Sequence, residues 1–207
     1  MTVDERTAGP ERNTSERAAG SERNTSERAA GSERSSAEKC RSAALRYVSM
    51  AAKTEGQVKD YLVRKEFSET EIEEAIEMLR EYRYVDDERY CRDYYIQGCR
   101  KGRGRRRIEQ ELERKKISRS IIRESLDNFL SEENPDYQDI LEETLTEKER
   151  AMALGRKMLK EQLSLGKSVD KAFCAKVARR LTSMGYDGSS IYSVIGYIMK
   201  NSQNGDF

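Results

Sequence analysis

Histidine is absent from the 207 residues of this chain. That absence removes the commonest general base of enzymes, every Ser-His or Cys-His catalytic pair, and the pH switches that depend on imidazole. The sequence also contains no GxxxxGK[ST], GxGxxG or GxSxG motif, so the usual signatures of phosphate binding and of a nucleophilic serine are missing. We therefore expect a protein that is not an enzyme and binds no cofactor.

Cysteine and long apolar runs are also scarce. The four cysteines, Cys40, Cys91, Cys99 and Cys174, form no CxxC pair, and zinc without histidine would need all four at an implausible spacing. We expect no metal site and small, reduced thiols. No apolar run approaches a transmembrane span, and the N-terminus is unlike a signal peptide, so we expect a cytoplasmic protein that has no membrane partner.

A pattern of seven positions occurs three times in the chain, with identical gaps of 4, 5, 1, 4, 4 and 3 residues. Self-similarity of this kind indicates tandem structural modules. The three copies are Val58, Leu62, Phe67, Ser68, Ile72, Ile76, Leu79; Ile108, Leu112, Ile117, Ser118, Ile122, Leu126, Phe129; and Val177, Leu181, Tyr186, Asp187, Ile191, Ile195, Ile198.

Each copy is typical of a helix, a short turn and a second helix. The first two residues lie four apart on one helical face, and the fourth (Ser68, Ser118 or Asp187) is a good N-cap for the helix that follows. Another helix precedes each pair: one at about 37–52, one after Asp86 and one after Thr146. The sequence therefore predicts an all-α fold of three tandem three-helix modules, similar to helix-turn-helix units, and no sheet.

Composition favours modules in a row over one compact core. Only 36% of the residues are hydrophobic and 37% are charged, which suits an elongated body whose modules touch only their neighbours. We predict repeats at 36–83, 84–130 and 147–201, an acidic linker at 131–146 and a tail at 202–207. The unit ERNTSERAAGS fills 11–21 and again 22–32, and such a segment has nothing to bury, so residues 1–35 are predicted to be a disordered tail.

Charge is polarised although the net charge of the chain is only +1. Residues 100–116 hold nine basic and three acidic side chains, while 131–149 hold eight acidic and one basic. Glycines within the basic stretch allow the backbone to turn and to approach a ligand, and a helix beginning near Arg105 would add a positive N-terminus. The candidate anion-binding residues are Arg100, Lys101, Arg103, Gly104, Arg105, Arg106, Arg107, Lys115 and Lys116.

Three interpretations of this basic stretch stay open. Arginines suit the phosphates of single- or double-stranded DNA, but they suit the acidic face of a protein equally well. Alternatively, Glu109, Glu111 and Glu113 pair with some of the cations, and the stretch is a solvated charged surface. Tyrosines nearby, at 90, 94 and 95, could stack on bases, although their spacing is more typical of core residues with a solvated hydroxyl.

The same region resembles a known family. Tyr84-Val85-Asp86-Asp87-Glu88-Arg89-Tyr90, then Gly102-Arg103-Gly104, then Ile108-x3-Leu112-x3-Lys116-Ile117, is similar to the central signature of the RecX family, bacterial regulators of the RecA recombinase. The segments Ala44-Leu45-Arg46-Tyr47-Val48 and Val58-x3-Leu62 match its first repeat. The resemblance covers about 37–200, and it departs at Glu66 and Lys116, where the family usually has glycine.

The resemblance implies a curved, monomeric protein of three three-helix repeats that lies in the groove of the RecA–DNA filament and limits recombinase activity. The leading hypothesis is therefore a regulator of RecA filaments that contacts DNA phosphate or filament protein. A sequence-specific DNA-binding protein of the helix-turn-helix kind is the alternative, and a pure protein-interaction scaffold is a third possibility.

Overall fold

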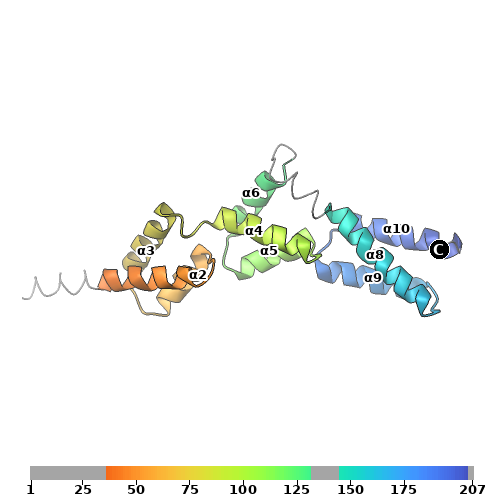
Figure 1. Ribbon diagram of the computed structural model, residues 1–207, viewed down its shortest axis with the longest axis horizontal. Coiled ribbons are helices and arrows are strands. Elements are labelled where there is room, and N and C mark those ends of the chain that lie inside the picture. Colours follow the sequence, from red (N-terminus) through yellow and green to blue (C-terminus); the bar gives the residue numbers. More distant parts are fainter. Residues whose placement is uncertain (1–35, 132–144, 205–207) are drawn as a thin grey trace, which may run out of the picture.

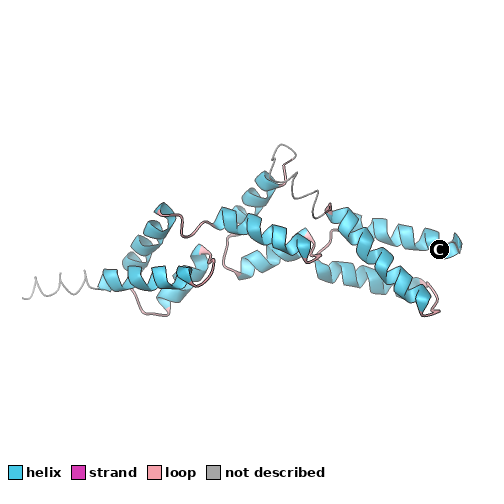
Figure 2. Ribbon diagram, in the orientation of Figure 1, coloured by secondary structure: helices cyan, strands magenta, loops and turns pink. Residues whose placement is uncertain are grey.

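The computed structural model describes residues 36–131 and 145–204, and its regular structure is entirely helical (Figure 2). Those ranges contain nine helices and no strand, so the predicted all-α class is confirmed. The tail predicted at 1–35, most of the acidic linker and residues 205–207 lie outside the described part of the chain. Among the helices described, none is long and apolar enough to cross a membrane.

The helices form three groups of three along the chain. The first group comprises a helix over 36–49, α2 (Glu55–Val63) and α3 (Glu69–Glu81). The second comprises α4 (Asp87–Arg100), α5 (Arg105–Arg114) and α6 (Arg119–Phe129). The third comprises α8 (Glu147–Ser164), α9 (Lys171–Met184) and α10 (Gly188–Asn204), which continues past the expected end at residue 201. We refer to these groups as modules 1, 2 and 3.

Short polar motifs fix where the helices begin. Capping boxes, in which the N-cap side chain and the third helical residue bond each other's backbone, are present at Thr54–Gln57, Ser68–Glu71 and Thr146–Glu149. Single side-chain caps come from Asp86 and Ser118. Each of these caps marks the point where a turn ends and the next helix begins. The modules therefore share one helix order and have turns of similar length.

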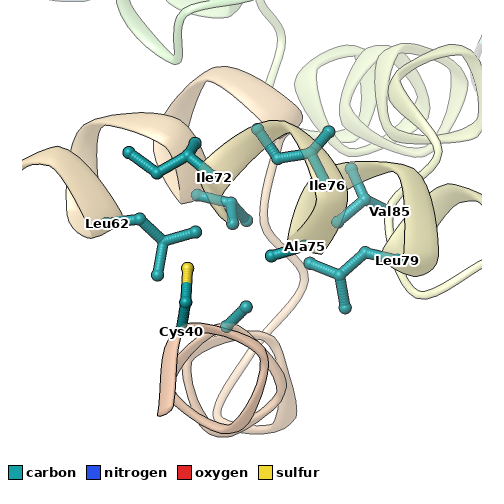
Figure 3. Packing of buried hydrophobic residues seen from close by; sticks show 9 residues of the cluster. Cys40, Leu62, Ile72, Ala75, Ile76, Leu79 and Val85 are labelled. Atoms are coloured by element: carbon teal, nitrogen blue, oxygen red, sulfur yellow. The ribbon is translucent and has the colours of Figure 1, made fainter. Parts of the chain in front are cut away.

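Each module has its own hydrophobic core. In module 1 the side chains of Cys40, Leu62, Ile72, Ala75, Ile76, Leu79 and Val85 converge from three helices and the turn after α3 (Figure 3). Module 2 has an equivalent cluster around Ile108 and Leu112, and module 3 has one around Val177 and Leu181, all four fully buried. Separate cores explain how so polar a chain can fold, since each module buries only a small apolar face.

One buried position lies outside the seven-residue pattern. Its residues are Ala75, Ser125 and Val194, one in the last helix of each module, and all are buried. In module 3, Val194 packs on Gly155 so closely that a Cβ on that glycine would lie 2.3 Å from Val194 Cγ1. In α10 Val194 is fully buried, whereas Ile191 and Ile195 are half-buried.

The modules follow one another along the long axis of an elongated body (Figure 1). The middle helices α2, α5 and α9 occupy corresponding places in successive modules. The N-terminal end of α2 meets the turn after α5, and that of α5 meets the turn after α9. Contacts made at these two places position the predicted basic residues, so they are described with the site.

Candidate nucleic-acid and filament interface

The basic stretch forms the end of α4, a tight turn and the whole of α5. Gly102 occupies the left-handed region with φ +67°, a conformation that glycine adopts without strain, and this reverses the chain after Lys101. Its carbonyl accepts a hydrogen bond from the hydroxyl of Tyr186 at 2.8 Å, so the turn is tied to module 3. Gly104 then serves as the N-cap of α5.

Gly104 makes a close backbone approach, but to module 3. Its N–H donates to the carbonyl of Met184 at 2.8 Å, and the N–H of Arg106 donates to the carbonyl of Gly185 at 3.2 Å. A Cβ on Gly104 would lie 2.3 Å from the Gly185 oxygen. The sequence suggested that a ligand would approach this glycine closely. Within the described residues, module 3 of the same chain makes that approach instead.

A single carboxylate completes this contact, which we call the second junction. Glu147, the first residue of α8, accepts the backbone N–H of Arg105 at Oε2 (3.4 Å) and that of Asp187 at Oε1 (3.2 Å). Burial raises the pKa of Glu147 above its ordinary value, while the two backbone N–H groups act to lower it. One side chain thus caps the N-termini of α5 and α10 together.

The first junction, between modules 1 and 2, repeats this arrangement. The hydroxyl of Thr54 donates to the carbonyl of Lys115, and the backbone N–H of Glu55 donates to Asp87 Oδ1 at 3.0 Å. Lys116 adds an ion pair from its Nζ to Asp60 Oδ2 at 3.2 Å. Two of the predicted anion-binding residues, Lys115 and Lys116, therefore help to hold module 1 against module 2.

Glu111 is the centre of an ion-pair cluster on α5. It receives the guanidinium groups of Arg103 and, at 3.0 Å, Arg107, together with the hydroxyl of Tyr94 at 2.9 Å. Burial opposes ionisation of Glu111, but the hydrogen bonds from Arg107 and Tyr94 and the charge of Arg103 outweigh it, and the pKa is lowered. Arg107 also reaches module 3, donating to the Ser183 carbonyl at 3.2 Å.

Arg105 has two acidic partners of its own. Its Nε lies 2.7 Å from Glu109 Oε1, and Nη2 lies 2.6 Å from Asp127 Oδ1 on α6. The interpretation in which nearby glutamates pair with the cations thus describes Arg103, Arg105 and Arg107. Any phosphate bound by these three arginines would have to displace carboxylates already in place.

Other cations of the stretch remain on the surface. Lys101, Arg106 and Arg114 are exposed, and none of them has an ion pair within the described part of the chain. Lys115 places its ammonium over the rings of Tyr90 and Tyr94, 5.6 and 5.1 Å from their centroids. The tyrosine side chains are half-buried in the module 2 core, with Tyr95 fully buried.

The cysteines carry no reactive signature. Cys40, Cys91 and Cys99 are buried, and burial raises the pKa of Cys40 to about 11 and that of Cys91 to about 12, so these thiols stay protonated near neutral pH. In the described ranges, no group of histidine, cysteine, aspartate and glutamate side chains could hold a metal ion. The chemistry that these residues support is binding through charge.

Comparisons with known proteins identify the family. The first three-helix domain of RecX matches residues 40–79, and the second matches 86–126. The regulatory protein RecX of Clostridium perfringens (strain 13 / Type A) is 36% identical over 153 residues, covering 72% of this chain and 71% of that protein. RecX of Clostridium botulinum (strain Eklund 17B / Type B) is 33% identical over 168 residues, covering 80% and 69%. The chain belongs to the RecX family.

Solved RecX structures share the fold. The crystal structure of RecX from Lactobacillus salivarius superposes with a TM-score of 0.64 at 20% identity, over 79% of this chain and 97% of that one. A second crystal structure of regulatory protein RecX gives 0.62 at 25% identity, over 81% and 75%. The two matched RecX domains correspond to modules 1 and 2. The role of module 3 is therefore argued from its own contacts.

Sequence reasoning overlooked the charge of module 3. α9 carries Lys171, Lys176, Arg179 and Arg180 and no acidic residue. The cations of α9 are spread along the helix and form no continuous basic run, whereas the cations of residues 100–107 are consecutive or nearly so. Counting the net charge of each predicted helix, and not only of continuous charged stretches, would have found these cations.

Proposed function

We propose that this chain binds RecA–DNA filaments and limits the strand-exchange and ATPase activities of the recombinase. Membership of the RecX family of regulatory proteins is the observation that carries the proposal. The absence of histidine and of cofactor motifs supports an action by binding, without catalysis, and we propose the cytoplasm as its compartment.

The arrangement of the modules supports a filament as the target. Three small cores in a row present a longer surface than one compact core of the same mass, and such a surface can reach several copies of a repeating partner. The two junctions hold neighbouring modules through backbone hydrogen bonds, so the surface has a defined shape. A surface that is already held in one shape loses less conformational entropy when it binds a partner.

Within the basic stretch, we propose that Lys101, Arg106 and Arg114 contact DNA phosphate or acidic filament protein. They are exposed and lack ion pairs among the described residues, so a ligand gains their charge without breaking an existing bond. Arg103, Arg105 and Arg107 instead support the turn and the second junction, and we assign them a positioning role.

The test is the single-stranded-DNA-dependent ATPase of RecA, titrated with the full chain. We expect inhibition at less than one chain per recombinase, because one regulator on a filament affects several protomers. A K101Q/R106Q/R114Q variant should need about tenfold more protein for the same inhibition, which corresponds to a loss of about 1.4 kcal/mol of binding free energy.

An unchanged ATPase at a several-fold excess of wild-type protein would reject the proposal. Binding that favours one DNA sequence over random DNA by roughly 10³-fold would then support the helix-turn-helix alternative. Equal inhibition by wild type and variant would leave filament regulation in place and remove the three cations from the interface.

A further inference from the structure

Module 3 is strongly basic, although no long basic run marks it in the sequence. Residues 147–204 hold eleven basic and five acidic side chains, a net charge of +6 that equals the charge of residues 100–116. The acidic residues are Glu147, Glu149, Glu161, Asp170 and Asp187, and none of them lies on α9. The positive charge of this helix is therefore not balanced along its own length.

The cations of α9 also lack the acidic partners that those of α5 have. None of the ion pairs found in the described ranges includes a cation of α9. Lys171, Lys176, Arg179 and Arg180 are all exposed. Arg179 donates from Nε to the carbonyl of Ala175 in its own helix at 3.4 Å, a bond that leaves its charge without an anion.

The outer face of α9 is shaped for close approach. The helix points Phe173, Val177 and Leu181 into the module 3 core. The exposed positions between and beside its cations carry small side chains, namely Ala172, Ala175, Thr182 and Ser183. At 1.5 Å of rise per residue, Lys176 and Arg180 lie on one side of the helix about 6 Å apart along the axis, roughly two phosphate steps of one strand of a duplex.

We propose that this face of α9, made by Lys171, Lys176, Arg179 and Arg180, binds the phosphate backbone of nucleic acid. The proposal rests on the proposed function, since the RecA filament contains DNA, and it adds a phosphate-binding surface on module 3 separate from the basic stretch of module 2. Charge complementarity identifies the partner: a polyanion supplies the missing anions all along the helix.

An acidic protein surface fits the same face less well. Protein interfaces are centred on buried aromatic or large apolar side chains, surrounded by a polar rim. The fully exposed positions of α9 include no large apolar residue, and its cations are separated only by small or polar side chains. Phosphate contacts do not need such a centre, because arginine and lysine bind the backbone oxygens directly.

The experiment measures binding of a fluorescein-labelled single-stranded oligonucleotide by anisotropy, without RecA, between about 50 and 200 mM salt. The test variant is K176Q/R179Q/R180Q. The control is K157Q/K160Q/K167Q, which removes the same charge from exposed positions on α8 and the turn after it. Both variants alter surface residues only, so both should retain the helical circular dichroism and melting temperature of the wild type.

We expect the α9 variant to bind at least tenfold more weakly at low salt. The slope of log affinity against log salt should fall by about 2, at roughly 0.7 for each lost phosphate contact with a single strand. The control should lose less than a third of that slope. Equal losses in the two variants would show that net charge alone attracts DNA, and would overturn the proposal.

An unchanged slope in the α9 variant would overturn it as well. Loss of binding to DNA-free RecA with an unchanged oligonucleotide affinity would assign the face to an acidic protein surface instead. Because the oligonucleotide assay contains no RecA, its outcome is independent of the wild-type ATPase titration that decides the proposed function.

Discussion

The two junctions between modules have the same plan but place their closely packed glycines differently. At the second junction Gly185 lies in the turn after α9, and a Cβ there would meet the Arg107 backbone nitrogen at 2.4 Å. At the first junction Lys116 takes the corresponding turn position, and the glycine is Gly56 on the facing helix, where a Cβ would lie 2.4 Å from Lys116 Cβ. The first junction therefore has room for the Lys116 side chain opposite Gly56, whereas the second has glycine on both sides, at Gly104 and Gly185.

Helix ends explain why the plan repeats. At both junctions the positive N-terminus of one middle helix faces the negative C-terminal turn of the next. At the second junction backbone N–H groups donate to the turn carbonyls, whereas at the first the Thr54 hydroxyl donates to the Lys115 carbonyl. The first residue of the following module then supplies a carboxylate to that N-terminus, Asp87 at the first junction and Glu147 at the second. The comparison shows that glycines in a basic stretch can serve packing between modules.

Breaking the second junction should have the largest effect. Gly185→Ala adds a methyl group where none fits and also forces alanine to φ +86°, so we expect a loss of about 2–4 kcal/mol in the free energy of unfolding. Gly166→Ala shares the left-handed backbone (φ +63°) but has open space around it, and should lose only about 1 kcal/mol. Urea denaturation measures both.

Gly188→Ala completes the set, since it has neither a left-handed backbone nor a neighbour within 4 Å, and it should be nearly neutral. If Gly185→Ala cost no more than Gly166→Ala, backbone strain alone would explain the loss. The close packing of module 3 on α5 would then contribute nothing measurable.

Removing the junction carboxylates should have an intermediate effect. Glu147→Ala deprives two backbone N–H groups of their acceptor, whereas Asp87→Ala deprives one, so we expect losses of roughly 2 and 1 kcal/mol respectively. Glu147→Gln keeps one acceptor oxygen and should lose less than alanine. Hydrogen exchange of the Arg105 amide reports the second junction directly, and unchanged protection in Glu147→Ala would contradict this assignment.

The same carboxyls predict a pH dependence. Burial raises the pKa of both Glu147 and Asp87, so the folded state binds protons more tightly than the unfolded chain does. Their contribution to stability is therefore lowest above the folded pKa and rises as the pH falls toward the unfolded value of about 4. Between neutral pH and about pH 5, the stability of the wild type should accordingly improve relative to Glu147→Gln; a constant difference would argue against a buried charge.

Local rules were enough to predict most of the fold. The spacing of Val58 and Leu62, repeated at Ile108 and Val177, determines which face of each middle helix is buried, and the capping boxes determine where helices begin. The burial of Val194 could not be predicted in the same way. Val194 packs on Gly155 of another helix, and spacing within one helix carries no information about that contact.

The candidate site was harder to predict, for a related reason. The sequence shows that Arg103 and Arg105 are cations, but whether they are available depends on where Glu111 and Asp127 come to lie after folding. The i,i+4 pair between Arg105 and Glu109 could be foreseen from spacing, whereas the pair with Asp127 on α6 could not. Whether a surface charge is available to a ligand is therefore predicted less well than burial, because it depends on ion pairs with residues from distant parts of the chain.

The smallest expected effect distinguishes backbone strain from side-chain packing at the first junction. Glu66 and Lys116 occupy the same turn position in modules 1 and 2, with φ of +62° and +70°, but only Lys116 faces another module. A left-handed backbone costs a side-chain-bearing residue about 1–2 kcal/mol, and glycine loses about 0.5–1 kcal/mol in flexibility. We therefore expect Glu66→Gly to stabilise the protein by roughly 0.5–1 kcal/mol.

Lys116→Gly relieves the same strain, but it removes the ion pair with Asp60 and the packing of its Cβ on Gly56. That ion pair is exposed and contributes little, about 0.2–1 kcal/mol, so the packing determines the balance. We expect Lys116→Gly to stabilise less than Glu66→Gly, or not at all, in thermal denaturation followed by circular dichroism. Equal stabilisation by the two variants would mean that the first junction gains nothing from the Lys116 side chain and is held by Thr54 and Asp87 alone.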